Sequence, residues 1–195
     1  MILDRYGLVQ LTAPSHEPIT LEEAKVFLRL DTEDHDFLLL SLITAAREHI
    51  EMYTRRQLVT ARYQLTMDDW PRAGIFKLPR PPLIHVERVN YIDGENVVQT
   101  VDPANYSVDM SRLFGRIVPT STYSWPALYD TINAVTVDYQ AGYGTAYSVP
   151  ETAKTVCLML VADMYEHAET RLEMRLEDNQ TYRRLLAGIT IEELA

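Results

Sequence analysis

The stretch that decides the fold is Pro18-Ile-Thr-Leu-Glu-Glu-Ala-Lys-Val-Phe-Leu-Arg-Leu-Asp31, which leads through an acidic turn into Ala45-Ala-Arg-Glu-His-Ile-Glu-Met-Tyr-Thr-Arg-Arg56. Thr20 and Glu23 have the spacing of a capping box, in which each side chain binds the backbone amide of the other residue. This pattern predicts a short helix that begins at the capping box and ends near Leu30.

A second, longer helix is predicted from about Asp36 to Thr54. The carboxylates between the two helices suit capping, and Asp34 is the best candidate for the second cap. Apolar residues recur at steps of three and four, as in a helix that buries one face: Leu39, Ile43, Ala46, Ile50 and Tyr53. The same periodicity places three charged residues on the solvent side, namely Arg47, Glu48 and Glu51.

From residue 61 to about residue 140 the pattern is typical of strands. Apolar and polar residues alternate most clearly at Tyr63, Leu65 and Met67, and Asp93-Gly94 marks a hairpin turn. Six or seven short strands with turns between them predict an antiparallel sheet inserted between helices, so the expected fold class is α+β. Further strands are expected around Val86–Tyr91, Val97–Val98, Tyr106–Asp109, Leu113–Val118 and Ala134–Tyr139.

Helical patterning resumes near Pro150, which suits the first turn of a third main helix. The expected organisation is therefore a helical body interrupted by strands, with an arm at each end. Its predicted parts are an N-terminal arm (1–17), a single domain (18–170) made of helices (18–58 and 149–169) and a β-rich insertion (60–141), and a C-terminal tail or helix for docking (171–195).

Composition narrows the function classes. The 195 residues carry a formal net charge of −10, so phosphates would repel this chain and it is a poor non-specific DNA binder. Its single cysteine, Cys157, excludes an intrachain disulfide. The apolar runs are only a few residues long, far shorter than a membrane span, and we expect no membrane association.

No motif points to catalysis, a cofactor or a metal, and we expect no enzyme. The acidic turn at 31–36 lacks the glycine of a calcium loop, so helix capping explains it more simply. Gly142-Tyr-Gly144 resembles a dinucleotide loop, but Tyr147 occupies the third glycine position. Asp68 and Asp69 are neighbours on a strand-like segment and should point to opposite faces.

Leu78-Pro-Arg-Pro-Pro-Leu83 has two interpretations, which we weigh evenly. Its prolines predict an extended path that lacks backbone donors, either as a protected edge strand or as a rigid arm for a neighbouring subunit. Two Trp-Pro pairs could likewise pack in the core or form interface hot spots. The interface residues predicted from chain position and type are Trp70, Pro79, Arg80, Pro81, Pro82, Trp125, Tyr143, Tyr182, Arg183, Arg184, Leu185 and Leu186.

The order of these blocks over residues 18 to 168 resembles the gp6-like head-tail connector (adaptor) family of tailed bacteriophages. Near the C-terminus the chain departs from the family, because Leu185-Leu-Ala-Gly188 stands where related chains often have a Leu-Leu-x-Pro-Tyr-Arg-like segment. The pieces that carry the resemblance are Thr20-Leu-Glu-Glu-Ala-Lys25, Glu51-Met-Tyr-Thr-Arg55, Leu78-Pro-Arg-Pro-Pro-Leu83, Asp102-Pro-Ala-Asn-Tyr106, Gly115-Arg-Ile117, Ala141-Gly-Tyr-Gly144 and Val149-Pro to Tyr165-Glu166.

The resemblance implies a structural protein of the virion head-tail junction, assembled in the host cytoplasm. It implies a homo-oligomeric ring, usually of twelve subunits, which binds the portal protein and presents a platform to a tail-side neck or tail-completion protein. Double-stranded DNA would pass through its channel without sequence-specific binding. The alternatives are another neck protein, such as a stopper or tail-completion factor, and a small ligand-binding or enzyme domain with an unrecognised site.

Overall fold

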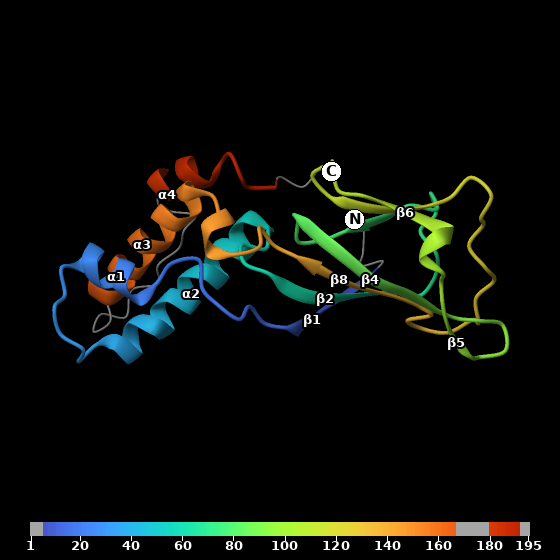
Figure 1. Cartoon of the computed structure of the whole chain (residues 1–195), viewed down its shortest axis with the longest axis horizontal. Coiled ribbons are helices and arrows are strands. Elements are labelled where there is room, and N and C mark those ends of the chain that lie inside the picture. The colour runs from blue at the N-terminus through green and yellow to red at the C-terminus, as the bar shows by residue number, and fades with distance from the viewer. Residues whose placement is uncertain (1–5, 167–179, 192–195) are drawn as a thin grey trace. The chain divides into compact units, whose positions relative to one another are not determined.

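The computed structural model describes residues 6–166 and 180–191, and Figure 1 labels most of its helices and strands. The chain divides into two compact units. We call Met1–Pro14 with Thr60–Gly142 the β unit, and Ser15–Val59 with Tyr143–Ala195 the helical unit. Within the described residues, no helix is long and apolar enough to cross a membrane.

The β unit contains two antiparallel sheets, which confirms the predicted class of α+β with strands between the second and third helices. The five-stranded sheet has the order β1-β2-β8-β4-β5, and the three-stranded sheet has the order β3-β7-β6. Their bounds are β1 Gly7–Thr12, β2 Ala61–Met67, β3 Phe76–Leu78, β4 Leu83–Ile92, β5 Val98–Thr100, β6 Tyr106–Asp109, β7 Gly115–Pro119 and β8 Val135–Ala141. A 3₁₀ turn, η1, spans Pro103–Asn105.

Strand β2 follows the predicted alternation, because Tyr63 and Leu65 are buried while the residues between them are partly exposed. Tyr63 lies opposite Tyr139 of β8, and their rings stack with centroids 5.8 Å apart. The predicted hairpin is also present, with Asp93 accepting hydrogen bonds from the backbone amides of Glu95 and Val97, both at 3.0 Å. Two strands, β1 and β3, were not predicted, and β1 makes part of the expected N-terminal arm an edge strand.

The proline-rich segment 78–83 was wrongly predicted to be extended. Arg80 has a left-handed backbone with φ of 59°, and the Pro81-Pro82 peptide bond is cis. The segment therefore turns sharply, and it connects β3 of one sheet to β4 of the other. The Tyr139 hydroxyl donates to the Pro79 carbonyl at 3.0 Å, which fastens this turn to β8.

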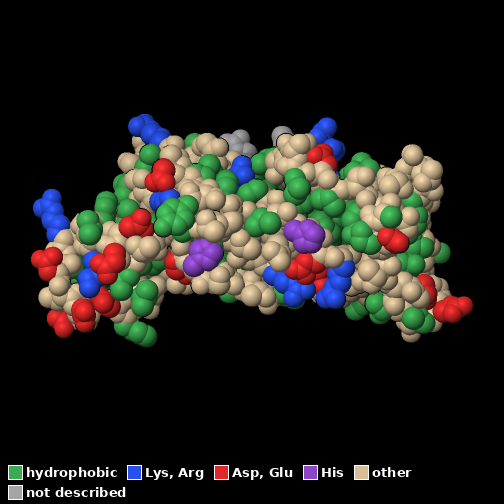
Figure 2. Space-filling view, viewed as in Figure 1, with side chains coloured by type: hydrophobic (Ala, Val, Ile, Leu, Met, Phe, Trp, Pro, Cys, Tyr) green, Lys and Arg blue, Asp and Glu red, His purple; other side chains and the backbone are tan. Residues whose placement is uncertain are grey.

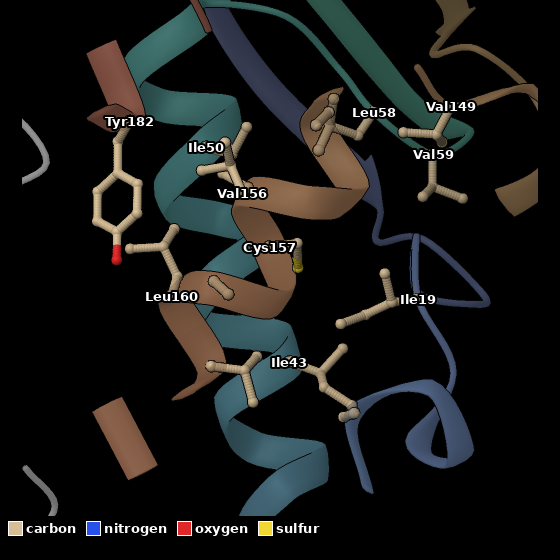
Figure 3. Close-up of a cluster of buried hydrophobic side chains, with 14 of the residues drawn as sticks. Ile19, Ile43, Ile50, Leu58, Val59, Val149, Val156, Cys157, Leu160 and Tyr182 are labelled. Atoms are coloured by element: carbon tan, nitrogen blue, oxygen red, sulfur yellow. The ribbon is translucent and has the colours of Figure 1, made fainter. Parts of the chain in front are cut away.

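The helical unit holds α1 (Leu21–Leu28), α2 (Asp36–Thr54), α3 (Glu151–Glu166) and α4 (Gln180–Leu186), with a 3₁₀ turn, η2, at Ala146–Ser148. Figure 3 shows that α2 and α3 bury facing apolar side chains between them, with Ile50 near Val156 and Ile43 below Cys157 and Leu160. The apolar stripe predicted for the second helix is therefore a core face, and the predicted bounds of that helix are confirmed.

The capping box is also confirmed. The Thr20 backbone amide donates to Glu23 at 2.7 Å, and the Glu23 amide donates to the Thr20 hydroxyl at 3.1 Å. The predicted cap of the second helix is wrong, since His35 occupies the N-cap position and makes no side-chain capping bond. Asp36 instead pairs with Lys25 of α1 at 2.8 Å, so this carboxylate joins two helices.

Candidate functional site: interaction surfaces

The described residues hold no group of three or more His, Cys, Asp or Glu side chains placed to bind a metal ion. Asp68 and Asp69 serve local backbone contacts: Asp68 accepts from the Asn133 amide and Asp69 from the Trp70 amide, both at 2.7 Å. The candidate functional sites are surfaces that could contact other proteins.

Large apolar side chains are exposed on both units, and Figure 2 shows hydrophobic atoms among charged ones over the visible face. Phe37, at the start of α2, is 87% exposed. Val26 and Phe27 of α1 are exposed as well and line a shallow groove with Leu158 of α3. Isolated exposed apolar residues are ordinary, but contiguous groups often mark protein contacts.

Trp70 and Trp125 pack against each other within the β unit. Their rings stack with centroids 4.6 Å apart. The Trp70 indole donates to the Pro126 carbonyl at 2.7 Å, and the Trp125 indole donates to the Gly74 carbonyl at 2.9 Å. Both tryptophans thus fasten the loops of their own unit and remain half-buried.

A groove of about 660 Å³ lies beside Trp70. Tyr129 and Ile132, which line the groove, are 41% and 76% exposed. Sequence reasoning missed both residues, because the loop after Trp125 has no periodic pattern and reads as an ordinary connection. The residues that line the groove are Asp68, Asp69, Trp70, Pro126, Ala127, Leu128, Tyr129, Asp130, Thr131 and Ile132.

A buried ionic network occupies the inner side of α2, where the sequence predicted solvent. Arg47 and Glu51 are only 5% and 6% exposed, so their predicted place on the wet face is wrong. Arg47 donates to Glu51 at 2.8 Å and to Glu17 at 2.7 Å. Burial disfavours the charged guanidinium, but Glu51 and Glu17 outweigh it and raise the pKa of Arg47.

The second oxygen of Glu51 holds the segment that follows α2. It accepts from the Gln57 side chain at 2.7 Å and from the Leu58 amide at 3.0 Å. The Leu58 carbonyl in turn accepts from the Tyr143 amide at 3.1 Å. The network therefore fixes the backbone of the helical unit close to where the chain leaves it and re-enters it.

Cys157 lies against this network, and its burial raises the pKa of the thiol to about 12. We expect native protein at about pH 8 to react with a thiol reagent at least about 100-fold more slowly than urea-unfolded protein, since only the thiolate reacts. The release of thionitrobenzoate measures this rate, and the single cysteine makes the signal specific for α3. Equal rates in the two states would contradict the burial of Cys157.

The face of the five-stranded sheet that points away from the buried side chains of Tyr63 and Leu65 is polar. Asp138 of β8, 1% exposed, accepts from Gln64 of β2 at 2.8 Å and from Arg88 of β4 at 2.7 Å. Next to it, Glu87 accepts from Arg62 at 2.7 Å. Burial would raise the pKa of Glu87, but hydrogen bonds, including this one, lower it overall. The three central strands are thereby linked by side chains as well as by their backbones.

Two hairpins of the β unit depend on ionised carboxylates. Asp109 accepts from the Ser111 hydroxyl at 2.6 Å and pairs with Arg116, and these hydrogen bonds lower the pKa of Asp109. Asp93 accepts from the Gln99 side chain at 2.8 Å and from two backbone amides, which lowers the pKa of Asp93. Both turns lose acceptors when these groups are protonated.

The β unit should therefore lose stability in acid. For a carboxyl group with a lowered folded pKa, the stabilisation is present above the unfolded value of about 4 and is lost as the pH falls below it. We expect the urea midpoint, followed by the fluorescence of Trp70 and Trp125, to fall between about pH 7 and pH 3. The drop should be smaller in Asp93→Asn. A midpoint independent of pH would contradict the assignment.

The C-terminal segment packs on the helical unit through its short helix. Tyr182 and Leu186, both predicted interface residues, are buried in the unit's own core. The Tyr182 hydroxyl donates to Asp163 of α3, and the Ile191 amide donates to the Thr54 carbonyl at 3.1 Å. The remaining parts of the predicted tail, 171–179 and 192–195, lie outside the described residues.

The other predicted interface residues differ in exposure. Arg183 and Arg184 are exposed, whereas Leu185 and Tyr143 are half-buried against the helical core. In the proline-rich turn Pro81 is buried, and its predicted companions Pro79, Arg80 and Pro82 are half-buried. The prediction that these residues contact other chains stays a prediction, with Arg183 and Arg184 the most accessible.

Comparisons with known proteins found one matching family and several solved structures of the same fold. A family model described as phage gp6-like head-tail connector protein matches residues 18–114. No curated protein matches the chain. Three solved structures of gene transfer agent particles contain a chain of the same fold. In the neck of an empty particle, computed with sixfold symmetry, the matching chain has 22% identity and a TM-score of 0.80, over 97% of each chain.

The other two are from native particles. The virion match has 22% identity and a TM-score of 0.79, over 96% of this chain and 97% of the other. In the neck computed with twelvefold symmetry, the matching chain has 20% identity and a TM-score of 0.75, over 97% of each chain. Over residues 18–114 the chain matches the phage gp6-like head-tail connector family, the same family that the blocks quoted from the sequence resemble.

Proposed function

We propose that this protein is a structural head-tail connector of a tailed phage or phage-like particle. It forms a ring, of twelve subunits, under the portal protein. The ring extends the channel for double-stranded DNA and presents a platform to a tail-side neck or tail-completion protein. The protein performs this role at the head-tail junction of the virion, without chemical turnover and without a cofactor.

The observation that carries this proposal is the family match over residues 18–114. The likeness to neck chains of gene transfer agent particles supports it, because it extends over 97% of the chain and one neck was computed with twelvefold symmetry. A net charge of −10 suits a channel wall along which DNA slides, because a wall of the same sign as phosphate does not hold the duplex.

The surfaces of the two units also support a protein-binding role. The exposed apolar residues of α1 and α2, such as Val26 and Phe37, offer contact area on the helical unit. The groove beside Trp70, with Tyr129 and Ile132 exposed along it, offers a second contact area on the β unit. A connector needs several distinct contacts, since it binds copies of itself, the portal and a tail-side protein.

Deletion of the gene for this chain in a producing cell tests the proposal. We expect DNA-filled or empty heads without tails to accumulate, since the tail has no platform. Addition of the purified protein to the cell extract should restore tailed particles. Normal numbers of tailed particles from the deletion strain would contradict the proposal, and electron microscopy distinguishes these results.

A further inference from the structure

A basic groove lies near the C-terminal end of α2. It has a volume of about 460 Å³, and its lining contains two arginines and no carboxylate: Tyr53, Gln180, Arg183, Arg184, Ala187 and Thr190. Arg183 and Arg184 are exposed, and neither forms an ion pair with a residue that the structure describes. In a chain with a net charge of −10, such a groove is a distinct local feature.

The turn before the N-terminal end of α2 has the opposite charge. Asp31, Glu33 and Asp34 are exposed there and form no ion pair with a described residue. Lys25, which is bound to Asp36, also attracts Glu33 electrostatically. The 19 residues of α2 separate the turn from the groove. At a rise of about 1.5 Å per residue this is about 28 Å, so the two features of one copy do not neutralise each other directly.

We propose that the Arg183–Arg184 groove of one copy receives the acidic turn, residues 31–34, of the next copy. This inference rests on the proposed ring and names a contact that closes it. Arginine forks match carboxylates in geometry as well as in charge. Groove against groove and turn against turn would both be repulsive, so the charges select a head-to-tail contact over a two-fold one.

Head-to-tail contacts between two different surfaces are the kind that generate rings when the rotation closes. The groove and the turn belong to the same unit and lie at opposite ends of its 19-residue helix. Each copy can therefore offer its turn to one neighbour and its groove to the other. The charges then fix the order of neighbours around the ring.

Charge reversal tests this contact in the assembled protein. We would measure sedimentation velocity of the full chain, alone and mixed with the portal protein of the same particle. Arg183→Glu with Arg184→Glu should weaken assembly at least about tenfold, and so should Glu33→Arg with Asp34→Arg. All four changes in one chain should restore assembly, because the pair is then re-formed with its signs exchanged.

Arg72→Glu with Arg112→Glu is the matched control. Both arginines are exposed in the β unit, and neither pairs with a described residue, so the same change in net charge should leave assembly unaltered. If a reversal variant fails to fold, the neutral Arg183→Gln with Arg184→Gln replaces it. Wild-type assembly should also weaken between about 50 mM and 500 mM salt, which screens exposed charges.

The outcomes separate the contact from the proposed function. Loss in each reversal and recovery in the fourfold variant support the contact. If both reversal variants assemble as well as the wild type does, the proposed contact is wrong, but the proposed ring is not affected. Loss in both reversals without recovery also overturns it, because the groove then meets a different partner. A wild-type chain that assembles neither alone nor with the portal overturns the ring and the contact together.

Discussion

Replacement of Arg47 by Ala is expected to lower the free energy of unfolding by about 3 kcal/mol, because it leaves a buried carboxylate without its cation. Glu51 is 6% exposed and keeps only its neutral donors, Gln57 and the Leu58 amide, in the variant. Glu17 loses the 2.7 Å bond that fastens the start of the helical unit. Urea unfolding followed by the reactivity of Cys157 measures the loss.

Glu48→Ala is the control for this variant. Glu48 also faces Arg47, but at 3.5 Å and with a side chain that is 67% exposed, so its removal should cost less than about 0.5 kcal/mol. Arg47→Leu combined with Glu51→Gln should recover at least half of the loss, since a neutral pair needs no counter-charge. A loss below about 1 kcal/mol for Arg47→Ala would show that solvent reaches the network.

Phe76→Ala should destabilise the β unit by about 3–5 kcal/mol, the range for removal of a buried phenylalanine ring. Phe76 of β3 is 1% exposed and presents its face or edge to both indoles, at 6.0 Å from Trp70 and 5.5 Å from Trp125. The substitution leaves a cavity beneath the stacked tryptophans. Their fluorescence should therefore shift in the native state as well as report the lower urea midpoint.

Phe37→Ala is the matched control, because the same side chain is 87% exposed at the start of α2. It should change the unfolding free energy by less than about 0.5 kcal/mol. If Phe76→Ala were equally mild, with unaltered native fluorescence, the ring could not be part of the core of the β unit. A large loss in Phe37→Ala would instead show that this exposed ring packs against the folded chain.

Local sequence patterns predicted the elements whose signal is contained in a short window. The capping box at Thr20 and Glu23 needs four residues, and the stripe of α2 repeats over five turns. The alternation of β2 is equally local in the sequence, although its inward face is buried against residues of the second sheet, such as Phe76 and Ile117. Elements of this kind are set by period and capping chemistry, which tertiary contacts reinforce here.

The charged residues of α2 show what local patterns cannot predict. Arg47 and Glu51 read as a solvent face because their partners are outside the window: Glu17 precedes Arg47 by 30 residues, and Gln57 lies beyond the helix end. The cap was misassigned for a related reason, since the carboxylate that matters, Asp36, is used by Lys25 of another helix. Polar partnerships of this range are invisible to periodicity.

Chain position alone did not predict which of the candidate interface residues are exposed. Tyr182 and Leu186 look like part of a docking tail, but the core of the helical unit buries them. The proline-rich segment was predicted to be an extended edge strand or arm, but the left-handed backbone at Arg80 makes it a turn. Conversely, Ile132 is exposed in a loop with no pattern at all. The exposure of a side chain depends on packing between segments that are distant in the sequence. Local sequence patterns do not contain this information.

The mass of the purified protein, alone and mixed with its portal, tests the connector role most directly. We expect the 22.4 kDa chain to form a stoichiometric complex with the portal protein whose added mass corresponds to about twelve copies, either by joining the portal as monomers or as a preformed ring. Light scattering coupled to size exclusion measures this mass. A chain that remains a monomer or dimer and elutes apart from the portal would contradict the connector role.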